Sequence, residues 1–231
     1  CPVNAVLVVA GNVTLEKVKT LAEKWFGDIP SGDPYKRNLP QEPEQTEERK
    51  QVIKANVPLD ALYKCWHMPG RLDRKYYIID LLTDILSGGG SSRLYQSLVK
   101  EKQLFSNIEC HHFGSTENGL VIIEGKLVKG VRIEDAEKAI EEELSKMKTE
   151  LVSETELQKV KNKTESMIAF EDMSVMSRAQ SLAYYEILGD ASWMNFELEK
   201  YGKVTTGDIL QESKNIFRAT NCNTIHYLSD N

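Results

Sequence analysis

The sequence predicts an α+β fold in which an antiparallel-dominated sheet carries helices packed on one face. Apolar and polar residues alternate in four stretches, which predicts strands at residues 49–56, 62–67, 106–114 and 120–127. Asn118-Gly119, between the last two stretches, is a strong hairpin signal. Helical spacing of apolar residues dominates the chain after this hairpin.

The remaining elements follow from caps and breakers. Thr14 is the expected N-cap of a first helix with Val18, Leu21, Ala22 and Trp25 facing inward, and Ser153-Glu-Thr-Glu156 is a capping box. Helical character then persists to Leu188, as one helix or as two with a break near Asp172–Ser174. Further elements are expected as follows: a helix over 136–151, a short helix over 193–201, a helix from 206 and a strand over 223–229.

Composition excludes several classes of protein. The 231 residues are 41% hydrophobic and 28% charged, and no apolar run approaches the length of a membrane span. A net charge of −6 argues against a surface that binds nucleic acid. The four cysteines are scattered without any Cys-x-x-Cys pair, so we expect reduced, mostly buried thiols.

The stretch 73–104 is expected to form a helix, a glycine corner and a second helix. Asp73 is the expected N-cap, Gly88–Gly90 end the first helix, and Ser91 or Ser92 can cap the second. A P-loop is excluded because a helix precedes the glycines and no Gly-Lys-Ser/Thr follows. Two interpretations stay open: a helix N-terminus that meets a peptide carbonyl or carboxylate, and a tight corner for close packing.

The chain begins with a run, Asn4–Ala10, that is too apolar for a free sheet edge and is expected to be a buried strand. From Ser31 to Glu48 the composition is that of a linker, with Pro34, Pro40 and Pro43. We interpret the sequence as a fragment whose N-terminal part is missing.

Four segments, taken in their order along the chain, resemble one family. They are Asn4–Gly11 with Ala22–Pro30, then Ile85–Tyr95, then Leu98–Leu104. Together they resemble the C-terminal lobe of the pitrilysin/insulinase-like zinc peptidases, whose relatives include the mitochondrial processing peptidases and the core subunits of respiratory complex III.

The resemblance implies an organisation into two similar lobes. Residues 1–30 would be a β-α remnant of the N-terminal lobe, 31–48 a linker, and 49–231 the C-terminal lobe. The implied partners are the missing N-terminal lobe and a peptide substrate, in a homo- or hetero-dimer. Zinc is implied for the full-length protein.

The family's zinc motif, His-x-x-Glu-His on a helix, is absent from this sequence. The four histidines are His67, His111, His112 and His226, and none has that spacing. We therefore expect no metal site and no catalytic residue in this chain. Cys110 and His112 could share a strand face and meet His67, but a half-buried strand with spare histidines is the commoner arrangement.

The resemblance also implies an arginine and, seven residues later, a tyrosine that hold the scissile carbonyl. Alignment places these roles at Val99 and Ser106, which cannot perform them, while Tyr95, Lys100 and Lys102 are out of register. Asp80 and Asp84 are interpreted as a solvated helix face. The candidate substrate-facing residues are Ser91, Ser92, Arg93, Lys102 and Ser106.

Three functions remain open at this point. The preferred one is the C-terminal part of a zinc metallopeptidase, inactive alone, which encloses peptides together with an N-terminal catalytic lobe. The alternative is a non-catalytic interaction subunit of the same fold. A third is a stand-alone module that binds peptides at a free sheet edge.

Overall fold

The structure is a computed structural model that describes residues 1–33, 38–40 and 42–230. The chain divides into two compact units: residues 1–43 with 164–199 form the first, and residues 44–163 with 200–231 form the second. Pro34, one of the three prolines of the expected linker, lies outside the described residues.

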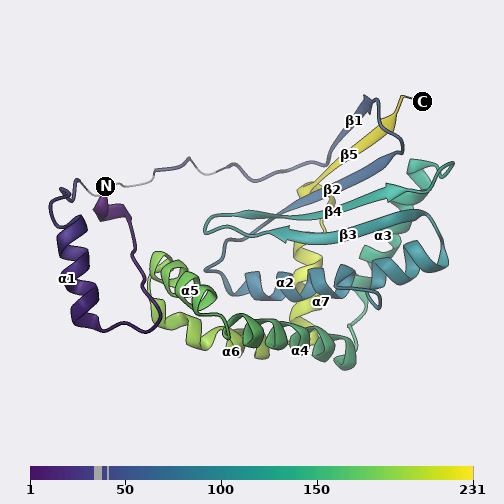
Figure 1. Cartoon of the computed structure of the whole chain (residues 1–231). Coiled ribbons are helices and arrows are strands. Elements are labelled where there is room, and N and C mark those ends of the chain that lie inside the picture. The colour runs from purple at the N-terminus through teal and green to yellow at the C-terminus, as the bar shows by residue number, and fades with distance from the viewer. Residues whose placement is uncertain (34–37, 41, 231) are drawn as a thin grey trace. The chain divides into compact units, whose positions relative to one another are not determined.

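A five-stranded sheet organises the second unit (Figure 1). Its strands are β1 (Arg49–Ala55), β2 (Ala61–Met68), β3 (Phe105–Phe113), β4 (Gly119–Leu127) and β5 (Cys222–Ser229). The strand order is β1-β5-β2-β4-β3, and every pair is antiparallel except β1 with β5. The expected antiparallel-dominated sheet and its 118–119 hairpin are confirmed.

Helices cover one face of this sheet (Figure 1). They are α2 (Arg74–Ser87), α3 (Ile133–Thr149) and α7 (Thr206–Ile216). The strand residues that face them are fully buried, as Leu62, Trp66 and Ile123 show. Because side chains alternate along a strand, the residues between these, such as Cys65 and Ile122, lie on the opposite face and are only half-buried. The expected packing of helices on one face is confirmed.

The caps predicted from sequence set the helix boundaries. The side chain of Asp73 accepts a hydrogen bond from the backbone N–H of Lys75 at 2.8 Å, and Ser153 and Glu156 cap each other reciprocally. The long helical stretch consists of two helices, α4 (Glu154–Glu171) and α5 (Val175–Leu188), with the break where the sequence indicated it. Gly189 ends α5 with a φ of 138°, a backbone conformation that favours glycine.

The corner after α2 differs from the prediction in the kind of helix that follows. The helix after the glycines continues as a π-helix over Tyr95–Glu101. Ser92 is buried and does not act as a side-chain cap, because its Oγ donates to the carbonyl of Gly89 at 2.6 Å. The serine therefore tightens the corner instead of capping the helix.

The first unit contains a 3-10 helix at Pro2–Asn4, helix α1 (Leu15–Phe26), α5, and a 3-10 helix at Ala191–Phe196 that leads into α6 (Glu197–Gly202). Thr14 caps α1 as predicted, through a hydrogen bond from the N–H of Lys17 at 3.3 Å.

Two predictions for this unit are wrong. Residues 5–10 form no strand and are mostly exposed, because no described strand pairs with them. The face of α1 that was expected to point inward is not buried either, and Trp25 is 67% exposed. A strand and an amphipathic helix need partners for their backbone groups and apolar faces, and the described residues provide none here.

No described helix is both long and apolar enough to cross a membrane. All four cysteines are free thiols; Cys110 and Cys222 are buried, Cys65 is half-buried and Cys1 is exposed.

Hydrogen exchange should distinguish the N-terminal run from the sheet. We expect the amides of Asn4–Gly11 to exchange faster than those of Leu120–Leu127, because the former lack ladder hydrogen bonds and the latter pair on both sides. The measurement is amide exchange followed by mass spectrometry on a strictly monomeric sample. Equal or greater protection of Asn4–Gly11 would contradict the structural assignment of this segment.

Candidate functional site

Two of the three candidate substrate-facing residues at the corner, Ser91 and Arg93, bind to helix α4. The guanidinium of Arg93 forms two hydrogen bonds with the carboxylate of Glu156, both at 2.9 Å. Ser91 accepts a hydrogen bond from Lys159 Nζ on its Oγ at 3.1 Å. Burial would raise the pKa of Glu156, but the stronger hydrogen bonds from Arg93 lower it to about 2. The corner therefore holds α4 in place with charged groups that are already paired.

The two remaining candidates lie elsewhere on the unit. Lys102 Nζ forms an ion pair with Glu142 of α3 at 2.7 Å. Ser106 Oγ donates to the carbonyl of Lys126 on β4 at 3.1 Å. Val99 is half-buried within the π-helix. The structure thus does not gather the five candidates in one pocket, and each of them has a partner within the protein.

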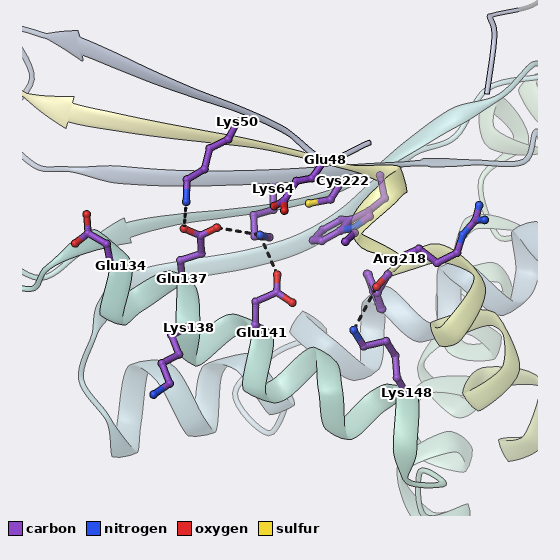
Figure 2. A pocket seen from close by; sticks show the side chains of 13 residues that line it. Glu48, Lys50, Lys64, Glu134, Glu137, Lys138, Glu141, Lys148, Arg218 and Cys222 are labelled. Atoms are coloured by element: carbon purple, nitrogen blue, oxygen red, sulfur yellow. Dashed lines mark hydrogen bonds and ion pairs between the residues drawn. The ribbon is translucent and has the colours of Figure 1, made fainter. Parts of the chain in front are cut away.

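A cavity of about 500 Å³ opens between the sheet and α3 (Figure 2). Its lining is strongly charged and contains none of the candidates named from sequence. Lys50 and Lys64 reach it from β1 and β2, and Glu137 and Glu141 reach it from α3. The sequence gives no local signal for this cavity, since its lining residues come from segments far apart in the chain.

Lys64 is the centre of the charged lining, and it is only 1% exposed. Its Nζ lies 2.9 Å from Glu141, 3.3 Å from Glu137 and 3.1 Å from Thr224 Oγ. Desolvation opposes the charge on Lys64, but the neighbouring acidic groups, Cys222 and the two glutamates, outweigh it and raise its pKa. The ammonium group is therefore charged at neutral pH and has a partner for each of its protons.

Glu137 is the carboxylate that joins the cations of the cavity. Besides Lys64, it meets Lys50 Nζ at 2.6 Å and His226 Nε2 at 2.7 Å. Burial alone would raise the pKa of Glu137, yet hydrogen bonds from Lys50 and His226 and the charge of Lys64 lower it to about 2. A carboxylate held so far below neutrality is a poor general base, so this network is structural in character.

Two cationic side chains at the other end of the cavity, Lys148 and Arg218, also donate hydrogen bonds within the protein. Lys148 Nζ donates to the carbonyl of Phe217 at 3.3 Å, and Arg218 Nε donates to the carbonyl of Asn215 at 2.8 Å. Trp66 and Phe217 close this end with an edge-to-face contact whose ring centroids are 5.0 Å apart. The lysines and glutamates around Lys64, together with Lys148 and Arg218, therefore already have hydrogen-bond or ion-pair partners within the protein.

A second polar cluster joins α2 to β3. His112 Nε2 lies 3.0 Å from the hydroxyl of Tyr76, and its Nδ1 lies 3.6 Å from Asp80. Tyr201 donates to Asp80 at 2.5 Å. Burial raises the pKa of Asp80 and lowers that of His112, although each group counteracts the shift of the other.

The solvated face expected at Asp80 and Asp84 is therefore wrong. Asp80 is half-buried within the cluster, and Asp84 pairs with Lys163 at 2.8 Å. Periodicity could not show this, because the covering residues, Tyr201 and Lys163, come from distant helices.

The histidines of β3 point to opposite faces of the sheet, as their adjacency requires. His112 and the buried Cys110 face the helices, whereas His111 lies on the other face. His67 contacts Asn221, its Nδ1 lying 3.2 Å from Asn221 Oδ1. Among the described residues, only one group has metal-ligand spacing, and it contains His111 with Glu109 and Glu124.

Replacing Glu137 by Gln should destabilise the protein by about 3 kcal/mol, because it leaves the buried Lys64 ammonium with less compensating charge. Urea unfolding at pH 7 measures this, with Glu134→Gln on the same helix as control, for which we expect a loss within about 0.5 kcal/mol. Equal losses in both variants would contradict the assigned role of Glu137.

The pH dependence gives a separate check. The pKa of Glu137 lies at about 2 in the folded protein, below its ordinary value of 4.5, so the unfolded state takes up the proton first on acidification. Its contribution to stability is thus complete above pH 4.5 and is lost as the pH falls towards 2. Glu137→Gln should flatten the pH dependence of the unfolding free energy in this window.

Comparison with known proteins places this fold in a family. Residues 2–164 match the family described as the peptidase M16 inactive domain. The chain is 24% identical over 227 residues to the zinc protease PqqE of Helicobacter pylori, covering 97% of this chain and 51% of the relative. It is also 24% identical over 189 residues to the uncharacterised zinc protease YmxG of Bacillus subtilis, covering 81% of this chain and 44% of the relative.

Solved structures show the same fold. A protease from Helicobacter pylori superposes with a TM-score of 0.86 at 22% identity, over 95% of this chain and 54% of the other. A peptidase M16 inactive domain from Pseudomonas fluorescens superposes with a TM-score of 0.77 at 15% identity, over 96% and 52% of the two chains. The chain spans about half the length of the curated relatives it matches. The resemblance to the C-terminal lobe of the pitrilysin/insulinase-like peptidases is confirmed, and the chain belongs to the peptidase M16 inactive-domain family.

Proposed function

We propose that this chain is the non-catalytic half of a two-lobed zinc metallopeptidase and encloses peptides together with a lobe that holds the zinc. The observation that carries the proposal is the family match, joined to the fact that the chain spans about half of relatives named as zinc proteases. The sequence lacks His-x-x-Glu-His, so the catalytic zinc and its general base belong to the other lobe.

The proposal divides the chain into the end of a preceding lobe (1–30), a linker (31–48) and the non-catalytic lobe (49–231). Exposed apolar residues support this assignment of the N-terminal part. Leu15, Trp25 and Phe26 on α1 are all more than half exposed, and the run 5–10 has no strand partner. These are the properties of elements whose packing partners lie in another lobe.

The residues of the described lobe support a role in enclosure more than in chemistry. Val99 offers no hydrogen-bond donor, and the hydroxyl of Ser106 is bound to a backbone carbonyl. Arg93 and Lys102 are neutralised by glutamates. A lobe surface with these residues can orient and confine a peptide. The negative charge that develops on the scissile carbonyl must then be stabilised by hydrogen-bond donors from another lobe or chain.

A non-catalytic interaction subunit of the same fold is the second candidate, and the same internal pairing of the candidate residues favours it. The two functions share a partner lobe and differ in whether the assembly cleaves peptides.

The first test is a peptidase assay of the chain alone and of the chain combined with a lobe that carries His-x-x-Glu-His. We expect no turnover by the chain alone and slow, zinc-dependent cleavage by the combination, which lacks the arginine and tyrosine donors. Formation of a stable complex without cleavage would favour the interaction subunit. Cleavage by the chain alone would overturn the proposal.

The second test restores the missing donors. We propose that a partner chain supplies the arginine and tyrosine that are absent here, which makes a hetero-dimer the active state. In the combined protein without such a partner, Val99→Arg with Ser106→Tyr should raise the rate of cleavage about a hundredfold or more, since one such donor is worth that much.

The matched control for this test is Val99→Arg with Ser106→Phe, which keeps the ring and removes the phenol. It should lose most of the gain in rate. A folded double variant that cleaves no faster than the parent would contradict the assignment of these two positions.

A further inference from the structure

The open face of the β3–β4 hairpin brings three possible metal ligands together. Glu109 and His111 are two residues apart on β3, so their side chains share a face of the sheet. Glu124 of β4 is the cross-strand partner of Glu109. One ligand atom from each of the three residues lies within 4.8 Å of the others.

The charges of this group are not compensated within the protein. Carboxylates directly opposite each other on paired strands repel and destabilise a sheet. Elsewhere in the second unit, acidic groups such as Asp84, Glu142 and Glu156 pair with a lysine or an arginine. Neither Glu109 nor Glu124 has such a partner among the described residues. A bound cation would remove this repulsion.

The donor set indicates which cation fits. One imidazole nitrogen with two carboxylates suits zinc and other divalent first-row transition metals, whereas magnesium and calcium prefer oxygen ligands alone. Ligands of one tetrahedral zinc are about 3.4 Å apart, given bond lengths near 2.1 Å. Since Glu109 is exposed and Glu124 and His111 are half-buried, rotation of the carboxylates can close the remaining distance.

The surroundings orient the ligands. Asn107 Nδ2 donates to Glu109 Oε1 at 3.0 Å, which leaves the second carboxylate oxygen available to a metal. Hydrogen bonds of this kind commonly fix metal ligands and strengthen binding. The hairpin ladder holds β3 and β4 in register at this point, so the backbone of the site is already formed.

We propose that Glu109, His111 and Glu124 form a binding site for a divalent transition metal such as zinc. The site lies on the sheet face opposite the helices and differs from the family's catalytic motif in sequence and in element. No metal was expected from the sequence, because strand pairing, and not spacing along the chain, brings Glu124 close to His111.

The experiment uses zinc chloride alone, titrated calorimetrically into the metal-free chain in a Cys1→Ser background. That background removes an exposed N-terminal thiol, which would itself bind zinc. We expect one zinc per chain, with binding weakened at least tenfold by His111→Asn, Glu109→Gln or Glu124→Gln. The matched control, Glu117→Gln in the turn of the same hairpin, should bind as the parent does.

A second measurement locates the ion independently of peptidase activity. Added manganese should broaden the amide resonances of residues 107–111 and 122–126 and spare those of β1. The proposal is overturned if no zinc binds, if the three ligand variants bind as tightly as the parent, or if broadening appears elsewhere. Because neither readout involves peptide cleavage, a negative result here leaves the proposed function untouched.

Discussion

The burial of the Lys64 ammonium group is the constraint on which the second unit depends. Lys64 lies on the central strand of the sheet and points towards the helices, where a charge without partners would be costly. Glu137 and Glu141, one turn apart on α3, meet it together. The rotation and position of α3 across the sheet are therefore fixed by an electrostatic requirement as well as by apolar packing.

The same constraint extends to the edge of the sheet. Glu137 also binds Lys50 of β1 and His226 of β5, which form the only parallel pair among the described strands. An edge strand such as β1 has few buried side chains, and here its lysine is held by the carboxylate that compensates Lys64. One glutamate thus connects three strands to the helix layer.

The sequence predicted most elements of this fold because their signals are local. The hairpin at Asn118-Gly119, the cap at Asp73 and the break at Asp172–Ser174 each depend on a few neighbouring residues, and all three are observed. The strand predicted at Asn4–Ala10 failed for a different reason. Its hydrophobicity predicted burial, but strand pairing depends on residues beyond its own neighbourhood, and residues 5–10 are mostly exposed.

The polar sites were beyond sequence reasoning because tertiary contacts create them. The pattern of α2 suggested a solvated Asp80, and only the approach of Tyr201 and His112 reveals a half-buried cluster. Likewise, the sequence places Lys64 on a strand, but its partners Glu137 and Glu141 lie more than seventy residues further along the chain. The alternation of side chains along a strand predicted that His111 and His112 would point to opposite faces of the sheet. It did not predict which residues each histidine would contact.

The two faces of the sheet in the second unit differ in burial and in the polar groups that they carry. The fully buried apolar residues of the strands and the Lys64 network lie on the helix face, whereas residues on the other face, such as Cys65 and Ile122, are only half-buried. On the open face, His111, Glu109 and Glu124 have no packing role comparable to that of Trp66 or Leu62. Val99 and Ser106 take no part in the Lys64 network, so side chains without catalytic donors at these positions are compatible with the fold. The open face can carry charged side chains such as those of Glu109 and Glu124 because they are at most partly buried there.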